Sequence, residues 1–463
     1  MPLLDPTDNR PVHFVGIAGA GMSALAELFA RRGVRVTGCD AAADGVGDLR
    51  RLGLEVAQGH DPAHADGARA LVVSSALPRE HPELVRAREL GLPVIRRAEA
   101  LGEAVSGGEL VAIAGTHGKT TTTVMTTEAL ASAGLAPTGV AGGRVGAWEG
   151  NLRYGGDRLF VVEADEYDRS FLALAPTIAV VTNVEADHLD IYADLADIRR
   201  TFEQFLAPAR HVVLCADDAG ANTLRTSSSA EVIRYGVAAE GQRAHRDARL
   251  VAIGVRVAGT GSAFEVEYDG ERLGEIELAV PGLHNVRNAL AAIGSGLALG
   301  ATVPDMGAGL AAFGGVERRF QRLGESAGVS VVDDYAHHPT EIVATLAAAR
   351  QAFPGRRIVA AFQPHLFSRT RDFAREFGQA LSAADAVFLA EIYPARERPV
   401  EGVTSTLVER ELTAGRLAWR GERAAMAESL AGFVRAGDVV LTIGAGDVTT
   451  TGPELLERLR AGA

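Results

Sequence analysis

The chain has 463 residues, of which 47% are hydrophobic and 23% charged, with a formal net charge of −13. This length predicts about three domains, each able to bury its own core. The acidic balance argues against a general binder of nucleic acids or membrane surfaces, which would carry a basic stripe. Cys39 and Cys215 are the only cysteines, so the sequence supports neither a disulfide framework nor a cysteine metal cluster.

The first elements predict a dinucleotide-type fold. Val12–Ile17 is a strand, Met22–Arg32 a helix, and Val34–Gly38 the next strand. Between the first two, Gly19, Gly21 and Ala24 satisfy the G-x-G-x-x-G/A pattern, and Asp40 follows Gly21 by 19 residues, where a ribose-binding acid is expected. The backbone N–H groups at the start of a helix can bind the phosphates of any nucleotide diphosphate. The pattern therefore predicts a pyrophosphate-bearing ligand, and a nicotinamide cofactor is the alternative.

Two further strands end in polar residues. Leu71–Val73 is followed by Ser74 and Ser75, and Val94-Ile95 by Arg96 and Arg97. In an open parallel sheet this edge faces the ligand. A linker over 104–109 then closes the first domain.

The segment Val111–Thr123, VAIAGTHGKTTTT, predicts a phosphate-binding loop between a buried strand and a helix. Its backbone N–H groups and the helix N-terminus suit anionic oxygens, Lys119 can reach phosphates, and the Thr120 hydroxyl can bind Mg²⁺. Ile113 stands where the full motif has glycine, so the loop is a shortened one. Lys119 is also the only lysine among 46 basic residues, and an ammonium is not equivalent to a guanidinium against phosphate.

Acidic residues follow two more strands. Leu159–Val162 runs into EADEYD, and Ile178–Val181 into TNVEADHLD. Carboxylates crowded beside phosphates repel them unless a cation such as Mg²⁺ intervenes. Glu163 and then His188 are the preferred ligands. Three other acids fit a solvated loop equally well: Asp165, Asp168 and Asp190.

The rest of the central region predicts hairpins and a helix. Leu250–Val257 and Phe264–Tyr268 alternate as strands of an antiparallel region. His284 and Asn288 share one face at the start of a helix over Val286–Leu299. They either cap that helix or meet an adenine edge.

A third α/β domain follows Arg318 and Arg319, an arginine pair placed to meet a γ-phosphate. Four hydrophobic strands each end in polar residues, as a doubly wound sheet with a ligand edge requires. They are Val329–Val332 before DDYAHH, Ile358–Phe362 before QPH, Ala386–Ile392 before YPARE, and Val439–Ile443 before GAGD.

Together the three units predict a ligase that activates a carboxylate. The carboxylate attacks the γ-phosphate of ATP, Lys119 and Mg²⁺ hold the acyl phosphate, and an amine displaces phosphate. His338 and His365 are the candidates for a general base, with bulk water as the alternative proton acceptor.

Eight segments in order resemble the Mur ligase family, and specifically its alanine-adding branch: GIAGAGMSALAELF, AGTHGKTTTT, EADEYDRSFL, TNVEADHLD, PGLHNVRNALAA, ERRF, DDYAHHPTEI and FQPHLFSRTRDF. The resemblance implies a Rossmann-like UDP-sugar-binding domain over 1–105, a P-loop ATPase domain over 106–317, and a Rossmann-like domain over 318–463 that closes on ATP and the amino acid. It implies cytoplasmic peptidoglycan precursor synthesis, in which ATP and L-alanine extend UDP-N-acetylmuramate. A monomer or weak homodimer is expected, with no nucleic acid or membrane partner.

The resemblance also implies roles for individual residues. Lys119, His188 and Arg319 would be catalytic, and Thr120, Glu163 and His188 would bind Mg²⁺. ATP would be bound by Gly115, Thr116, His117, Gly118, Lys119, Thr120, Thr121, His284, Asn285, Asn288, Arg319, Asp334 and Tyr335. The UDP-sugar would be bound by Gly19, Ala20, Gly21, Asp40, Ser74 and Ser75. The amino acid would be bound by His338, His365 and Arg369.

Two departures from the family pattern qualify this picture. Some relatives carry a carbamylated lysine near a second metal, which this chain cannot form because its only lysine lies in the phosphate loop. Leu366 stands where some members have arginine, so carboxylate recognition would depend more on Arg369. The alternatives are a murein-recycling ligase that adds a tripeptide to the same UDP-sugar and, from another class, a nicotinamide-dependent oxidoreductase.

Overall fold

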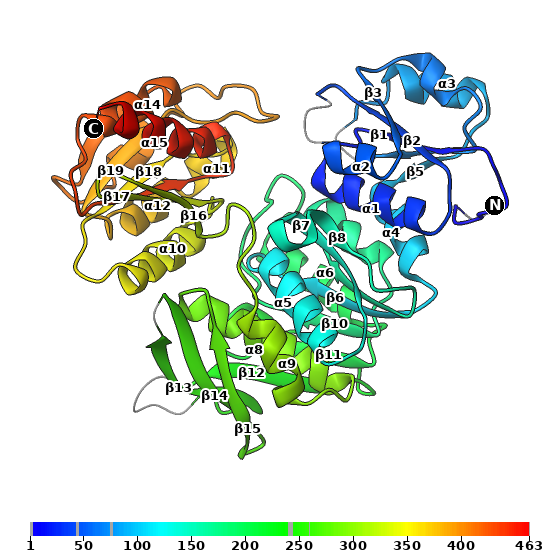
Figure 1. The fold of residues 1–463 in the computed structure, drawn as a ribbon, viewed down its shortest axis with the longest axis horizontal. Helices are drawn as coiled ribbons and strands as arrows, with labels where there is room; N and C mark the ends of the chain where they lie inside the picture. Colours follow the sequence, from blue (N-terminus) through cyan, green and yellow to red (C-terminus); the bar gives the residue numbers. More distant parts are fainter. Residues whose placement is uncertain (1–2, 43–45, 75–76, 239–243, 259, 463) are drawn as a thin grey trace. The chain divides into compact units, whose positions relative to one another are not determined.

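The computed structural model describes residues 3–42, 46–74, 77–238, 244–258 and 260–462. The chain forms two compact units. The first comprises residues 1–256, 263–278 and 286–314, and the second comprises 257–262, 279–285 and 315–463. Three sheets organise these units (Figure 1), which confirms the predicted α/β architecture with three sheet-centred parts.

The N-terminal sheet has five parallel strands in the order β3-β2-β1-β4-β5. The order reverses between β1 and β4, and ligands of such sheets bind beyond the strand ends at this point. The strands are β1 (Val12–Val15), β2 (Val36–Asp40), β3 (Glu55–Gln58), β4 (Ala70–Val73) and β5 (Val94–Arg96). The helices are α1 (Ala20–Arg31), α2 (Gly47–Arg51), α3 (Pro82–Glu89) and α4 (Arg97–Val105).

The central sheet has ten strands in the order β15-β14-β13-β12-β11-β10-β6-β9-β7-β8. The strands are β6 (Glu109–Ala114), β7 (Thr138–Val145), β8 (Gly150–Arg153), β9 (Leu159–Glu163), β10 (Ile178–Val181), β11 (His211–Cys215), β12 (Glu231–Val237), β13 (Leu250–Ala258), β14 (Gly261–Tyr268) and β15 (Glu271–Leu278). The helices are α5 (Lys119–Ser132), α6 (Leu195–Leu206), α7 (Ala219–Asn222), α8 (Leu283–Ala298) and α9 (Val303–Ala311).

The hairpin region predicted after residue 215 belongs to this same sheet. The sequence analysis missed β12, which pairs in parallel with both β11 and β13. β13, β14 and β15 therefore continue the central sheet outward. The helix expected from Val286 begins at Leu283, so His284 and Asn285 lie in its first turn.

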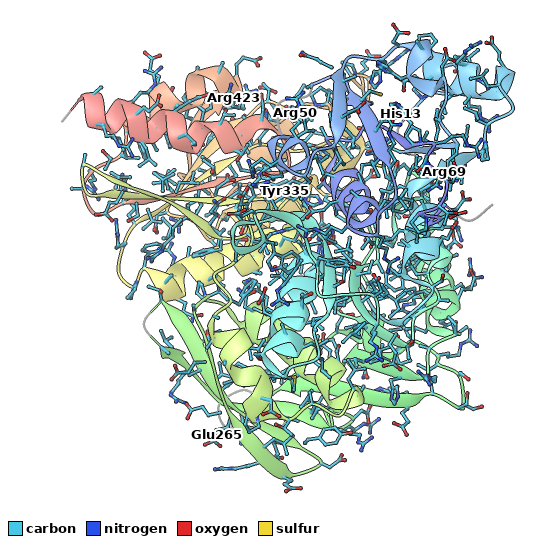
Figure 2. All side chains as sticks on the ribbon, turned by 45° about the vertical axis from the view of Figure 1, so that its right-hand side comes forward. His13, Arg50, Arg69, Glu265, Tyr335 and Arg423 are labelled. Atoms are coloured by element: carbon cyan, nitrogen blue, oxygen red, sulfur yellow. The ribbon has the colours of Figure 1, made fainter. Side chains whose placement is uncertain are left out.

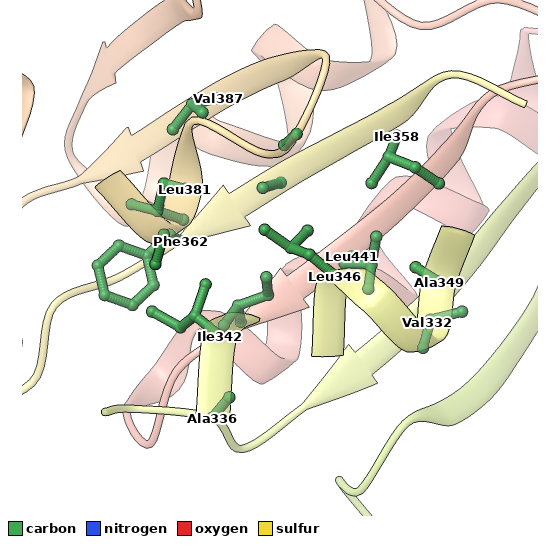
Figure 3. Close-up of a cluster of buried hydrophobic side chains, with 14 of the residues drawn as sticks. Val332, Ala336, Ile342, Leu346, Ala349, Ile358, Phe362, Leu381, Val387 and Leu441 are labelled. Carbon is green, nitrogen blue, oxygen red and sulfur yellow. The ribbon is translucent and has the colours of Figure 1, made fainter. Parts of the chain in front are cut away.

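The C-terminal sheet has six strands in the order β16-β17-β21-β18-β19-β20, parallel except for the antiparallel edge strand β16. Pro339 begins α10 as predicted, and Ile342 and Leu346 of that helix pack with Phe362 and Leu441 of the sheet in one buried cluster (Figure 3). The strands are β16 (Gln321–Ser326), β17 (Val329–Asp334), β18 (Ile358–Phe362), β19 (Ala386–Ala390), β20 (Leu417–Gly421) and β21 (Val439–Ile443). The helices are α10 (Pro339–Ala352), α11 (Phe367–Asp372), α12 (Ala374–Leu381), α13 (Thr406–Glu409), α14 (Arg423–Ala431) and α15 (Thr451–Ala461).

Within the described ranges, no helix combines the length and apolar character that crossing a bilayer requires.

Candidate active site

The loop between β6 and α5 has a backbone that glycine alone accommodates without strain. Gly115 has φ +139° and Gly118 has φ +80°, both in regions that L side chains rarely adopt. A Cβ built on Gly115 would lie 2.0 Å from Thr182 Oγ1, and one on Gly118 would lie 2.8 Å from Asn288 Oδ1. The loop therefore depends on these glycines for both its conformation and its packing.

Residues after β10 hold the loop in place. Thr182 Oγ1 donates to the carbonyl of His117 at 2.6 Å, and the His117 N–H donates to Asn183 Oδ1 at 2.7 Å. The Glu185 N–H donates to Thr116 Oγ1 at 2.9 Å. The segment TNVEADHLD, in which the sequence predicted His188 as a metal ligand, thus also fixes the shape of the phosphate loop.

Lys119 points into the loop and not into solvent, with its side chain 14% exposed. Its ammonium donates to the carbonyl oxygens of Gly115 at 2.6 Å and Thr116 at 3.2 Å, and to Glu166 Oε1 at 2.9 Å. Burial by itself lowers the pKa of Lys119, but the charges of Glu166 and Asp165 outweigh this effect and the net shift is upward. The ammonium is therefore charged and preorganised at the start of α5.

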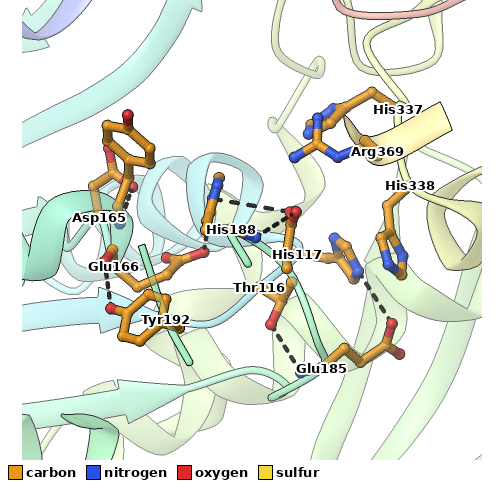
Figure 4. Close-up of polar contacts among 12 residues, drawn as sticks. Thr116, His117, Asp165, Glu166, Glu185, His188, Tyr192, His337, His338 and Arg369 are labelled. Atoms are coloured by element: carbon orange, nitrogen blue, oxygen red, sulfur yellow. Dashed lines mark hydrogen bonds and ion pairs between the residues drawn. The ribbon is translucent and has the colours of Figure 1, made fainter. Parts of the chain in front are cut away.

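Glu166 is a buried partner of Lys119 that the sequence analysis did not single out. Burial raises the pKa of this carboxyl to about 7, against the opposing effect of Lys119. Tyr192 Oη donates to the Glu166 carbonyl at 2.6 Å, and His188 Nε2 lies 3.8 Å from Glu166 Oε1 (Figure 4). Nothing in the spacing of EADEYD distinguishes this glutamate from its neighbours, since only the fold brings it to Lys119.

The predicted metal ligands lie around the same loop. Glu163 ends β9, its Oε2 accepts from the Gly142 N–H at 2.7 Å, and its charge helps to raise the pKa of Lys119. His188 has φ +53°, an unusual value for a non-glycine residue. Thr120 is buried in the first turn of α5. Asp165 instead accepts from the Tyr167 N–H at 3.1 Å.

The other two of the three acids that the sequence left open, Asp168 and Asp190, are exposed. The Asp168 side chain is 40% exposed and 3.8 Å from Arg96.

Three polar residues of α8, His284, Asn285 and Asn288, each contact a different part of the chain. Asn288 Oδ1 accepts from Thr122 Oγ1 at 3.2 Å, which ties α8 to α5. Asn285 Nδ2 donates to the Pro281 carbonyl at 2.7 Å, and the His284 ring lies against Gly282.

The glycine-rich loop of the N-terminal sheet is supported by Asp40. Its Oδ2 accepts from the Ala18 N–H at 2.9 Å and its Oδ1 from the Ala42 N–H at 3.1 Å. Gly21 faces Arg97, because a Cβ at Gly21 would lie 2.9 Å from Arg97 Nη1. The absence of a side chain here lets a guanidinium approach the start of α1.

A cavity of about 340 Å³ lies next to this loop, lined in part by Ser74, Arg96, Arg97, Asp168 and Arg169. The lining also includes Glu99 and Asp165, so three guanidinium groups and three carboxyl groups meet at this cavity. Guanidinium groups can bind anionic ligands with charge-assisted hydrogen bonds. The predicted residue Ser75 is outside the described ranges. The sequence placed Arg96 and Arg97 at the ligand edge without assigning them a role, and Arg169 gave no signal.

In the C-terminal unit, two arginines flank one tyrosine. The guanidinium carbons of Arg318 and Arg319 lie 4.7 and 5.1 Å from the centre of the Tyr335 ring. Asp334 accepts from the N–H groups of Phe320 and Ala336, both at 2.8 Å. Burial raises the pKa of Asp334 to about 6, although Arg319 and the two backbone donors oppose the shift. Both Asp334 oxygens thus stabilise the protein's own backbone.

Of the predicted amino-acid-binding residues, His365 and Arg369 lie together, whereas His338 caps a helix. His338 is the N-cap of α10, with its side chain accepting from the Thr340 N–H. The His365 ring stacks on Tyr393 with centroids 5.8 Å apart, and its Nδ1 lies 3.4 Å from Arg369 Nη1. Arg369 is 6% exposed, so its charge is held in a defined position.

Comparison with known domains accounts for nearly the whole chain. Residues 11–108 match the Mur ligase family catalytic domain, 113–296 the Mur ligase middle domain, and 318–446 the Mur ligase glutamate ligase domain. The chain belongs to the Mur ligase family. This membership confirms the resemblance inferred from the eight sequence segments, and the family's three domains correspond to the three sheets.

Individual relatives are similar over their full lengths. The chain is 49% identical over 458 residues to a UDP-N-acetylmuramate–L-alanine ligase of Kineococcus radiotolerans, covering 97% of this chain and 96% of that protein. It is 45% identical over 471 residues to the ligase of the same name from Streptomyces avermitilis, covering 99% of each.

Solved structures of the family share this fold. A UDP-N-acetylmuramate–alanine ligase from Thermotoga maritima superposes with a TM-score of 0.82 at 28% identity, covering 98% of this chain and 100% of that one. A murein peptide ligase from Psychrobacter arcticus gives a TM-score of 0.71 at 25% identity, covering 97% and 98%.

Proposed function

We propose that this Mur ligase joins L-alanine to UDP-N-acetylmuramate in peptidoglycan precursor synthesis. A carboxylate oxygen of the sugar attacks the γ-phosphorus of ATP, which gives an acyl phosphate and ADP. The alanine nitrogen then attacks the acyl carbon, inorganic phosphate leaves, and the nitrogen loses a proton. Full-length similarity to two ligases of this name, together with a preorganised Lys119 at the phosphate loop, supports the proposal.

The phosphate loop, residues 115–121, is proposed to bind the β- and γ-phosphates of ATP. Its glycines leave the backbone open, and Lys119 supplies a compact positive charge where negative charge develops in the transition state. We assign the nucleotide base and ribose to His284, Asn285, Asn288, Asp334 and Tyr335, and a phosphate to Arg319.

Mg²⁺ is the expected companion of ATP, and Thr120, Glu163 and His188 would hold it. Thr120 and Glu163 fit, because Mg²⁺ binds hard oxygen ligands and usually retains several waters, whereas His188 would supply a nitrogen. Within the described residues, Glu163 Oε1 accepts no hydrogen bond, while Oε2 is fixed by the Gly142 N–H. When bound, the ion would offset charge on the phosphate oxygens. Glu166 would orient Lys119 beside it.

The substrates are assigned to the remaining parts of the chain. Gly19, Ala20, Gly21, Asp40, Ser74 and Ser75 would bind the UDP-sugar, with Arg97 added from the geometry of the glycine-rich loop. His338, His365 and Arg369 would bind L-alanine, whose carboxylate suits a buried guanidinium. The proposed domain boundaries remain 1–105, 106–317 and 318–463.

ADP release with UDP-N-acetylmuramate and either L-alanine or a murein tripeptide tests the reaction. We expect turnover with L-alanine. Faster turnover with the tripeptide would assign the chain to the murein peptide ligases, whose fold it shares. NADH oxidation in place of ADP release would support the oxidoreductase alternative.

The single lysine allows a direct test of the ATP site. An amine-reactive reagent can modify only Lys119 and the chain's α-amino group. Saturating ATP should protect Lys119 from labelling, as measured by peptide mass spectrometry. Lys119→Arg should lower kcat at least 100-fold, because the larger planar group cannot reproduce the ammonium contacts. Equal labelling with and without ATP would exclude phosphate binding at this loop.

A further inference from the structure

A second cluster of potential ligands lies inside the N-terminal sheet, centred on Glu83 of α3. Glu83 is 0% exposed, and in the described part of the chain its only ion-pair partners are His60 and His64. All four histidines of residues 1–105 gather around it: His13, His60, His64 and His81. A buried carboxylate without a lysine or arginine needs another source of positive charge or of protons.

The donor atoms are close together. Cys39 Sγ lies 3.1 and 3.2 Å from the two Glu83 oxygens, and His64 Nδ1 lies 2.8 Å from Glu83 Oε1. Ligand atoms of His13, Cys39, His64 and Glu83 all lie within 4.8 Å of one another. Donors around a tetrahedral Zn²⁺ are separated by about 3.3–3.8 Å, given bonds of about 2.0–2.3 Å. Small side-chain movements would therefore convert this cluster into a metal-binding geometry.

His13 provides independent support for a ligand at this position. It lies on β1 (Figure 2) and is 2% exposed. Its Nδ1 contacts Thr37 Oγ1 at 2.9 Å, whereas its buried Nε2 has no hydrogen-bond partner among the residues that the structure describes. Metal-binding histidines commonly have this arrangement, in which one nitrogen is fixed by a neighbour and the other is left for the metal.

The charge states of these groups suit metal binding. Burial lowers the pKa of His13 to about 4, so its imidazole is neutral at pH 7. Burial raises the pKa of Glu83, but hydrogen bonds from Cys39 and His64 outweigh this effect and keep it below its usual value. Burial and Glu83 raise the pKa of Cys39, so the thiol holds its proton until a cation replaces it. Binding of a divalent ion would then release the thiol proton as the sulfur–metal bond forms.

We propose that His13, Cys39, His64 and Glu83 form a structural zinc site in the N-terminal domain. One thiolate, two imidazoles and one carboxylate are ligands that Zn²⁺ accepts in a closed tetrahedral site. His60 and His64 side chains are 23% and 25% exposed, which gives the ion a path from solvent. The site is separate from the ATP chemistry and does not depend on the proposed ligase activity.

The ion would also stabilise the glycine-rich loop. The Cys39 carbonyl accepts from the Gly16 and Ile17 N–H groups at 2.8 and 3.1 Å. The next residue, Asp40, accepts from the Ala18 N–H. Fixing the Cys39 side chain would therefore restrain the backbone to which this loop is attached.

The test uses the full-length protein, freed of metal with a chelator and assayed with excess Mg²⁺ to occupy the phosphate-loop carboxylates. Co²⁺ serves as the spectroscopic probe because a thiolate ligand gives an intense near-ultraviolet charge-transfer band, and Zn²⁺ affinity is measured by competition with a chromogenic chelator. We expect one Zn²⁺ per chain, a Co²⁺ band that Zn²⁺ removes, and a thermal midpoint that Zn²⁺ raises.

Cys39→Ser should abolish the Co²⁺ band and weaken Zn²⁺ binding at least tenfold. Cys215→Ser is the matched control, because Cys215 is the other buried thiol and lies in the central sheet. It should keep both the band and the affinity. The metal-free thermal midpoints of both variants show whether each is folded. Absence of the band in the wild-type protein, its loss in Cys215→Ser, or unchanged Zn²⁺ affinity in Cys39→Ser would overturn the proposal.

Discussion

Glu166→Gln isolates the charge that holds Lys119. The ammonium has three acceptors, two of which are loop carbonyls and the third Glu166. The amide can still accept one hydrogen bond, but a buried positive charge loses its counter-charge. Removing one member of a buried ion pair costs about 3–5 kcal/mol, and the retained hydrogen bond reduces that cost, so we expect a loss of about 2–3 kcal/mol without nucleotide.

Nucleotide should suppress much of this effect, since phosphate oxygens can take over the pairing of Lys119. Thermal midpoints measured without ligand and with saturating ATP analogue and Mg²⁺ should therefore differ more in Glu166→Gln than in the wild type. Glu109→Gln is the control, because its ion pair with Arg210 is exposed and an exposed pair contributes about 0–1 kcal/mol. If Glu166→Gln were equally destabilised with and without the analogue, the pair would be purely structural and the reasoning wrong.

Three further predictions test other parts of the structure. Gly115→Ala should reduce stability and nucleotide affinity more than Gly134→Ala does. Both glycines have positive φ, but a Cβ has space at Gly134 and none at Gly115. Gly134→Ala should therefore show only the backbone penalty for a left-handed conformation, about 1–2 kcal/mol. Arg97→Ala should raise the KM for UDP-N-acetylmuramate about 10–100-fold, as expected for a lost charge-assisted hydrogen bond, and should leave the KM for ATP unchanged. The control Arg88→Ala removes an exposed arginine and should leave activity unchanged. Burial raises the folded-state pKa of Asp334 to about 6, so its contribution to stability is lost as pH rises through 6. Urea titrations should show that the wild type gains about 1.4 kcal/mol more than Asp334→Asn between pH 7 and pH 5, because other groups such as Glu166 titrate in both proteins.

The parts of the site that the sequence predicted are local in the chain. The phosphate loop needs only a buried strand, two glycines and the start of a helix within Val111–Thr123, and the structure has these elements in that order. The polar residues after β17, β18 and β21 were predictable for the same reason, since parallel strands bring their carboxyl ends to one edge.

The parts that the sequence missed depend on contacts between distant segments. Glu166 meets Lys119 across 47 residues, and Arg97 meets Gly21 from another helix. The cluster around Glu83 draws on three strands or helices and the segment after β3, and no spacing rule for metal motifs links its members. Composition suggested an isolated thiol at Cys39, because a site built from single residues on several elements leaves no signature in any one of them.

The geometry also gives a reason for the composition. The chain has one lysine, and the other 45 basic residues are arginine. The Lys119 ammonium fits three acceptors at 2.6–3.2 Å while only 14% exposed. A guanidinium is planar and larger, so it cannot direct donors at two carbonyls and a carboxylate around one nitrogen. Elsewhere arginine pairs with acids, as Arg249 does with Asp269, or lies over aromatic rings, where its planar shape is suited to the contact. The contacts of Lys119 therefore give a structural reason why this position has lysine and not arginine.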